Sequence, residues 1–320
     1  MPRIGILAAS DGWHIGELRR ALAARGCAAV RLDPTRVGAT AGGADGAGGR
    51  AAIVAQRGDA GAGAATAGAT TAAGTAGVET LEDLDALVVR VVPPGSLDQI
   101  VFRIDALHLL AGRGLVIVNG PRCLERTIDK HWTSRLLDEA GIPTPRTFVT
   151  ERADRALEAF AAFGDVVVKP LLGSGGRGLF RVSDPDLAWR AFRTLEQQRA
   201  VIYLQEFVPH RQHDLRLFTA GGRIVAAARR EGEGWKSNVA AGAVARAHVP
   251  TDAQADLARR AAAVVEADYA GVDLLEAEDG RLLVTEVNGI PGWSGVQETT
   301  RTDIAGAIAD TVVARLEEQR

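Results

Sequence analysis

Two carboxylates and an amide near the end of the chain have the spacing expected of ligands to a divalent cation. Between Gly271 and Asn288, the dipeptide Asp279-Gly280 separates two apolar runs, which predicts a β-hairpin with that dipeptide as its turn. Counting outward from the turn puts Asp273 directly across from Glu286, with Asn288 two residues further along the same face. Opposed carboxylates repel each other, and a hard cation accepts such oxygen ligands.

We therefore expect Asp273, Glu286 and Asn288 to hold Mg²⁺, or Mn²⁺ in its place. Two alternatives stay open from the sequence. The acids could point outward and pair with arginines. A slip of one residue in the hairpin would instead separate the three groups onto opposite faces.

A glycine-rich segment from Gly173 to Gly178 follows a predicted strand that ends at Lys169. It matches G-x-G-x-x-G, but the dinucleotide fingerprint needs a helix after the third glycine, and Leu179 to Val182 is typical of a strand. We expect a hairpin loop whose backbone N–H groups approach phosphates beside the Lys169 ammonium. The loop residues concerned are Ser174, Gly175 and Gly176. An ordinary flexible hairpin with a solvent-facing lysine is the alternative.

Arginines lie on the predicted strands between these two motifs. Arg216 follows Asp214 on one strand, and Arg230 ends a strand that begins with the apolar run from Ile224 to Ala228. Because side chains alternate between the faces of a strand, at least one arginine should face the acids of the hairpin. Arginine forks suit carboxylates and phosphates.

Nucleophilic catalysis has no visible basis in the sequence. There is no Ser/His/Asp elbow or Cys/His pair, so we expect the chemistry to proceed without a protein nucleophile. His210 and His213 have no third ligand nearby, which favours a solvated or capping role for both.

Three successive parts of the chain must position these groups. A β-α-β beginning, with a strand from Ile4 to Ala9, predicts a parallel sheet covered by helices over residues 1–122. Within it, residues 38–77 are almost entirely Ala, Gly and Thr, with only Ile53 and Val54 as large apolar residues. We interpret them as a flexible insertion.

The second part, residues 123–200, has a predicted helix from Thr127 to Ala140 and carries the glycine-rich loop. The third, residues 201–320, contains the basic strands, the acidic hairpin and a C-terminal helix. Both of these parts contain strands and helices. The predicted fold class is therefore α/β, with two α+β subdomains after the first domain.

Composition narrows the class of protein. The 320 residues are 47% hydrophobic and 24% charged, with a net charge of −3, which gives no general electrostatic reason to bind nucleic acid or a membrane. No apolar stretch reaches 18 residues. The two cysteines, Cys27 and Cys123, are far apart in sequence, so we expect a protein of the reducing cytoplasm.

Taken in order, the motifs resemble those of the ATP-grasp superfamily, and within it the RimK-type ligases that add an amino acid, commonly glutamate, to a carboxylate. The carrying segments are Asp129-Lys130, Val167 to Pro170 with Gly173 to Gly178, Gln205 to Val208, Asp214 to Arg216, Arg229-Arg230, Lys236 to Asn238, Gly271 to Asp273, and Glu286 to Gly292. The resemblance implies a Rossmann-like pre-ATP-grasp domain followed by two subdomains that clasp ATP.

The resemblance also implies roles for individual residues. Lys130 and Lys169 contact the nucleotide phosphates, Asp214 reaches the ribose, and Arg230 and Arg216 steady the migrating phosphoryl group and a substrate carboxylate. The remaining implied nucleotide-site residues are Gln205, Glu206, Phe207 and Val208 of the adenine connector, and Lys236, Ser237 and Asn238.

The implied activity is ATP-dependent formation of an amide through an acyl phosphate. Glutamate and a carboxylate acceptor in a protein, a peptide or a pterin or furan C1 cofactor are the expected substrates, and a homo-oligomer is the expected assembly. A dipeptide or D-alanine-type ligase and a catalytically inactive nucleotide-binding module are the alternatives.

Overall fold

The chain folds into two compact units. In the computed structural model, the described residues are 1–41, 52–58, 77–173, 177–232, 234–235 and 243–320. The first unit comprises Met1–Pro121 with Asp303–Arg320, and the second comprises Arg122–Thr302. The C-terminal residues 303–320, which we expected to belong to the third part of the chain, therefore fold with the first part.

The first unit is built on one mixed sheet. Side by side, its strands are β4 (Val78–Thr80), β3 (Ile53–Arg57), β2 (Ala28–Ala39), β1 (Arg3–Leu7), β5 (Ala86–Val89) and β6 (Val116–Val118). β1 is parallel to both β2 and β5, as the β-α-β pattern predicts. Its helices are α1 (Trp13–Ala23), α2 (Leu97–Gly112) and α9 (Ile304–Glu318).

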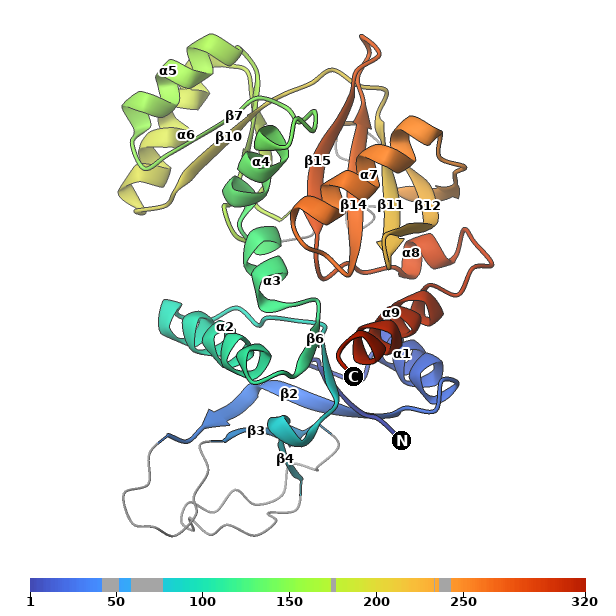
Figure 1. Cartoon of the computed structure of the whole chain (residues 1–320). Helices are drawn as coiled ribbons and strands as arrows, with labels where there is room; N and C mark the ends of the chain where they lie inside the picture. Colours follow the sequence, from blue (N-terminus) through green and yellow to red (C-terminus); the bar gives the residue numbers. More distant parts are fainter. Residues whose placement is uncertain (42–51, 59–76, 174–176, 233, 236–242) are drawn as a thin grey trace. The chain divides into compact units, whose positions relative to one another are not determined.

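Helix α9 joins the first unit by packing beside α1 (Figure 1). Arg25 on the chain after α1 makes a two-pronged contact with Asp310 of α9, with N–O distances of 2.6 and 2.8 Å. Apolar α9 side chains such as Ile308 and Val312 are fully buried. The C-terminal helix was predicted but its partner was not, because Arg25 and Asp310 are 285 residues apart in the sequence.

The expected flexible insertion at 38–77 is wrong for its described parts. β2 extends to Ala39, and β3 pairs antiparallel with both β2 and β4. Ile53 is only 2% exposed and Ala55 is fully buried. A short alternating run suffices here because strands on both sides supply hydrogen bonds and apolar contacts. Residues 42–51 and 59–76 of that prediction lie outside the described part of the chain.

The second unit contains two antiparallel sheets. The first has the strand order β7 (Thr147–Thr150), β10 (Ile202–Glu206), β8 (Val166–Lys169) and β9 (Phe180–Val182). Helices α5 (Ala153–Phe163) and α6 (Pro185–Gln197) cover one face, where Phe160 and Phe192 pack against Val168 and Leu204. The odd-numbered positions of β10 are therefore left on the other face.

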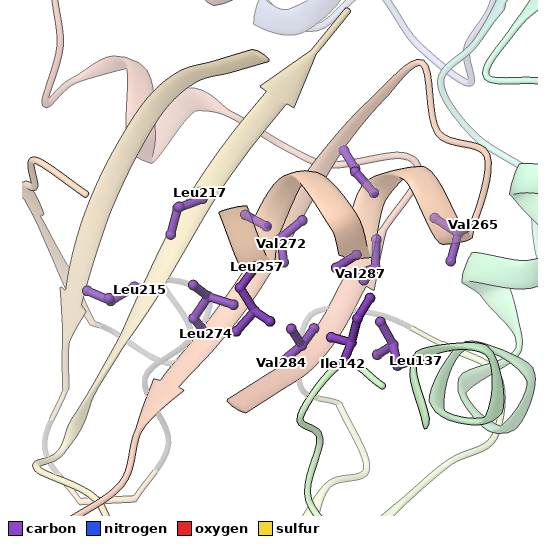
Figure 2. Close-up of a cluster of buried hydrophobic side chains, with 14 of the residues drawn as sticks. Leu137, Ile142, Leu215, Leu217, Leu257, Val265, Val272, Leu274, Val284 and Val287 are labelled. Carbon is purple, nitrogen blue, oxygen red and sulfur yellow. The ribbon is translucent and has the colours of Figure 1, made fainter. Parts of the chain in front are cut away.

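The second sheet of this unit carries the acidic hairpin. Its strands lie in the order β13 (Val244–Ala247), β12 (Arg223–Glu231), β11 (His213–Ala220), β14 (Tyr269–Glu276) and β15 (Leu282–Asn288). Helix α7 (Asp252–Val264) packs on one face, where Leu257 shares a buried apolar cluster with Leu215, Leu274 and Val284 (Figure 2). Strand alternation then directs Asp214 and Arg216 of β11 and Asp273 of β14 to the opposite face.

Asp129 divides the helix expected over 127–140 into two. α3 (Pro121–Ile128) ends just before it, and α4 (Lys130–Glu139) begins just after it. The Asp129 carboxylate accepts hydrogen bonds from the backbone N–H groups of His131 and Trp132, at 2.8 and 3.1 Å. This N-cap puts Lys130 at the first position of α4.

No helix in the described ranges is long and apolar enough to cross a membrane.

Candidate active site

Arginines and carboxylates alternate on one face of the second sheet of the second unit. In the strand register Asp214 pairs with Arg230, and Arg216 pairs with Asp273. Asp273 in turn pairs with Glu286. Directly paired residues have neighbouring side chains on the same face, so the five groups form a continuous polar array.

Arg230 is the centre of this array and is only 6% exposed. It donates two hydrogen bonds to Asp214, of 2.6 and 2.5 Å, and its Nη2 lies 3.0 Å from Asp273 Oδ2. Burial alone would lower the pKa of Arg230, but the charges and hydrogen bonds of Asp273 and Asp214 outweigh it and raise that pKa. The guanidinium is therefore a permanently charged, fixed donor.

Asp273 has a buried oxygen that is suited to a cation. Arg216 Nε lies 2.8 Å from Asp273 Oδ1, but without hydrogen-bond geometry. Within the described ranges, Asp273 Oδ1 thus has no hydrogen-bond partner. The Arg216 guanidinium compensates the charge of this oxygen as an ion pair, and the lone pairs that accept no hydrogen bond suit coordination of a hard cation.

The hairpin register reached Asp273 and Glu286 as expected, but by a different route. The turn contains three residues rather than two, since the N–H of Ala277 bonds to the carbonyl of Arg281. The register then shifts between Asp273 and Leu274, which leaves Thr285 as an extra residue. The two one-residue departures cancel, so Glu286 still lies opposite Asp273.

Asn288 takes its expected place two residues along, opposite Gly271. Its Oδ1 accepts a hydrogen bond of 2.9 Å from the N–H of Ile290. Across the described residues, no group of three His, Cys, Asp or Glu side chains is placed to hold a metal. The predicted set of two acids and one amide lies outside that class of site, and its donor chemistry fits Mg²⁺.

Two lysines approach the same region. Lys169, at the end of β8, donates a 2.6 Å hydrogen bond to Gln205 Oε1, and Lys130 donates one of 2.6 Å to the carbonyl of Gly173. Burial lowers the pKa of Lys169 to about 8, with Glu286 opposing and Lys130 adding to the shift. Burial also lowers the pKa of Lys130. An anion between them would offset this cost.

A cavity of 120 Å³ lies between the two sheets of the second unit. Most of the predicted site residues with described positions line it: Lys169, Gln205, Glu206, Phe207, Val208, Asp214, Arg230, Asp273 and Glu286. Lys130, Arg216 and Asn288 do not. The structure thus brings together Lys169, the end of β10 with the residues that follow it, and the acidic array.

The sequence reasoning missed Arg181 and Trp235. The Arg181 guanidinium lies 3.5 Å from the centre of the Phe207 ring and is held by Asp165, while the Trp235 ring meets Phe207 edge-on at 6.3 Å. Trp235 also lines the cavity. The position of Arg181 on the strand after the glycine loop was the only available signal for it.

Some predicted positions have no described coordinates. Ser174, Gly175, Gly176, Lys236, Ser237 and Asn238 lie outside the described residues. The antiparallel pairing of β8 with β9 confirms the hairpin interpretation of the segment that joins them.

The expectation for His213 is wrong. Its side chain is buried, and its Nε2 lies 3.0 Å from Glu276 Oε2 on the face opposite the array. His210 lies nearer the cavity, with its Nδ1 2.8 Å from the carbonyl oxygen of Val208.

Comparison with protein families matches residues 127–312 to the RimK-like ATP-grasp domain. Among curated proteins, the tetrahydromethanopterin:α-L-glutamate ligase of Methanosarcina acetivorans is 31% identical over 250 residues, covering 69% of this chain and 77% of that protein. The α-aminoadipate–LysW ligase LysX of Sulfolobus acidocaldarius is 31% identical over 195 residues, covering 59% and 71%.

Solved structures share the fold at lower identity. The ATP-grasp ligase PsnB, complexed with a minimal precursor, Mg and ADP, superposes with a TM-score of 0.69 at 20% identity and covers 98% of both chains. The D-cycloserine synthetase DcsG gives the same TM-score at 16% identity, covering 98% of this chain and 99% of its own.

Proposed function

Because the chain belongs to the RimK-like ATP-grasp family and is an ATP-dependent carboxylate–amine ligase, we propose that it joins glutamate to the carboxylate of a C1-carrier cofactor of the pterin or furan type. Arg230, Asp214 and Asp273 line one cavity together with Lys169. The proposed site rests on this arrangement. The glutamate ligases among the relatives support the choice of amine.

The proposed reaction has two steps. A carboxylate oxygen of the acceptor attacks the γ-phosphorus of ATP, the bond to the β-phosphate oxygen breaks, and ADP leaves. The glutamate amine then attacks the acyl carbon, loses a proton, and expels phosphate as the amide forms. Such a reaction needs fixed positive charge around the transferred group rather than a protein nucleophile.

The chain offers that charge from two sides. Lys169 and Lys130 hold the phosphates, because each ammonium is desolvated and gains by binding an anion. Arg230 is fixed by its two carboxylates and stabilises the phosphoryl group as it moves. Arg216, which forms an ion pair with Asp273, is assigned to a substrate carboxylate from the family resemblance.

Asp273, Glu286 and Asn288 would hold the divalent cation, Mg²⁺ or Mn²⁺. When bound, such a cation neutralises negative charge on the phosphates. The register that puts Asp273 opposite Glu286 supports this assignment, because it sets two carboxylates side by side.

The nucleotide base is proposed to lie against the connector from Glu206 to Val208, beside Phe207 and Trp235. Gln205 is proposed to contribute to nucleotide binding through its hydrogen bond with Lys169. Asp214, which is bound to Arg230 here, is proposed to reach the ribose, and the loop groups at 174–176 and 236–238 to contact the phosphates.

We also propose that residues 1–122 form an acceptor-facing part and residues 123–200 and 201–320 two nucleotide-binding parts, as the sequence predicts, except that residues 303–320 fold with the first unit. A cytoplasmic location is proposed because both cysteines are free thiols. A homo-oligomeric assembly is proposed from the family resemblance alone.

The test is ADP release by purified protein across a panel of carboxylates and amines. We expect release with glutamate and a pterin or furan carboxylate. Release with D-alanine alone would instead identify a dipeptide ligase. Binding of ATP without ADP release for any pair would favour the inactive module, and product mass identifies the amide.

A further inference from the structure

The side chain of Gln205 lies at the centre of a hydrogen-bonded network behind the nucleotide cavity. It is 4% exposed on β10. Its Oε1 accepts the 2.6 Å hydrogen bond from Lys169, and its Nε2 lies 3.3 Å from Thr147 Oγ1 and 3.4 Å from the Tyr203 hydroxyl. One amide thus connects a lysine of the cavity wall to the hydroxyls of the buried Tyr203 and the half-buried Thr147.

The strands dictate which residues can meet here. Gln205 pairs with Thr147 on β7, and Tyr203 pairs both with Val149 on β7 and with Lys169 on β8. Tyr203 and Gln205 are two residues apart, so they lie on the face of the sheet that α5 and α6 do not cover. The network is therefore set by the register of three strands.

The direction of each hydrogen bond follows from the available protons. When the Thr147 hydroxyl donates to the carbonyl of Pro145 at 3.0 Å, its oxygen is left to accept from Gln205. If the amide were reversed, Gln205 would present its oxygen to a hydroxyl whose proton is already used. It would also present two N–H donors to the Lys169 ammonium, which has no acceptor.

Tyr203 adds a second constraint of the same kind. Its hydroxyl lies 2.7 Å from Ser134 Oγ on α4 and can donate its single proton there while it accepts from Gln205. Both hydroxyls thus favour one orientation of the amide, the one in which Oε1 faces Lys169. A buried amide in the wrong orientation would lose several hydrogen bonds at once.

We propose that Thr147 and Tyr203 are positioning residues for nucleotide binding, which fix the Gln205 amide so that it holds the Lys169 ammonium in place for the phosphates. This inference rests on the phosphate-binding role proposed for Lys169. A lysine side chain has four rotatable bonds, and ordering it before the nucleotide arrives reduces the entropy lost on binding. Neither hydroxyl touches the nucleotide in this arrangement; both act through Gln205.

The redundancy of the two hydroxyls gives a specific test. Thr147→Val and Tyr203→Phe each remove one constraint and leave the other. We expect each alone to raise the Kd for ATP by less than about 1.5-fold, so that independent effects would give about twofold at most, and the double variant to raise it roughly tenfold, about 1.4 kcal/mol. Calorimetry of ATP binding with Mg²⁺ measures Kd, and kcat from ADP release should change much less.

A purely structural role would not produce that pattern. Additive effects, or no effect of the double variant, would overturn the inference. In a Gln205→Met background there is no amide to orient, so removing both hydroxyls should leave Kd unchanged. A further rise in that background would show that the hydroxyls act by another route. Thr147→Ser keeps the hydroxyl. Combined with Tyr203→Phe, it should therefore give the Kd of the Tyr203→Phe single variant.

Three controls separate the possible failures. Thr219→Val removes a buried hydroxyl of the other sheet, 3.4 Å from the carbonyl of Ala270, and should leave Kd unchanged. If Lys169→Met leaves Kd unchanged, the proposed site itself fails. If it raises Kd while the hydroxyl variants do not, only the positioning role fails.

Should the double variant not fold, Gln205→Met replaces it, because it removes the amide that both hydroxyls orient and should raise Kd about as much as the double variant would. An unchanged Kd for Gln205→Met would contradict the role.

Discussion

Arg230 and Asp214 lie directly opposite each other on β12 and β11 and share two parallel hydrogen bonds, of 2.6 and 2.5 Å. The same guanidinium approaches Asp273 at 3.0 Å. Arg230 therefore balances two buried carboxylates, one of which we assign to the cation. Its loss should affect stability as well as chemistry.

Arg230→Ala should lower the free energy of unfolding by about 3–5 kcal/mol, because it leaves buried carboxylates without a counter-charge. Urea denaturation measures the change. The matched control is Arg246→Ala, which breaks the exposed pair with Glu231 and should cost about 0–1 kcal/mol. Similar losses of unfolding free energy for the two variants would show that the buried carboxylates do not depend on the charge of Arg230.

Glu286→Gln should raise the Mg²⁺ concentration needed for half-maximal ADP release, and added Mg²⁺ should partly restore turnover, because an amide is a weaker ligand than a carboxylate. Glu276→Gln is the control, since Glu276 bonds His213 and Gln254 on the opposite face. It should not change the Mg²⁺ requirement. A Glu286→Gln deficit that Mg²⁺ cannot relieve would contradict the metal assignment.

Ile53→Ala should lower the free energy of unfolding by about 2–5 kcal/mol, as expected for truncation of a buried side chain. Val54→Ala, at the half-buried neighbouring position, should cost clearly less. Thermal and urea unfolding of both variants check this. If neither substitution changed stability, β3 would not be part of the folded sheet.

Cys123 should resist alkylation in the native protein. Its side chain is buried, and this burial, assisted by the charge of Asp268, raises the pKa of its thiol to about 12. Unfolded protein, with a thiol pKa near 9.0, should react faster as the pH rises from 7 to 9, whereas native Cys123 should not.

The same shift has a consequence for stability. Since the raised pKa means that only the unfolded state loses this proton between pH 9 and 12, Cys123 should reduce stability as pH rises through that range.

Mass spectrometry after iodoacetamide treatment locates the alkylated cysteine and tests the expected resistance of Cys123. Alkylation of native Cys123 that accelerates between pH 7 and 9 would contradict the burial.

The acidic hairpin shows what sequence pattern can predict. Alternation and the Asp279-Gly280 dipeptide placed Asp273 opposite Glu286, and the structure confirms that pair. The three-residue turn and the extra residue Thr285 were not predicted. Either change alone would have moved Glu286 to the other face of the sheet. Asp273 still lies opposite Glu286 because the two changes compensate.

Contacts between distant segments were beyond such reasoning. The packing of α9 beside α1 and the hydrogen bond of Ser134 to Tyr203 depend on how elements meet, not on local periodicity. The burial of His213 was missed for the same reason, since its partner Glu276 lies on another strand. Propensity also missed β3, whose burial comes from its neighbours.

The central claim is that the chain activates a carboxylate as an acyl phosphate. Acceptor labelled with ¹⁸O in its carboxylate, incubated with ATP, Mg²⁺, glutamate and the purified protein, tests it most directly. We predict that one labelled oxygen passes into the released phosphate for each amide formed, and that Glu286→Gln slows both processes together. Normal amide formation with unlabelled phosphate would contradict the claim.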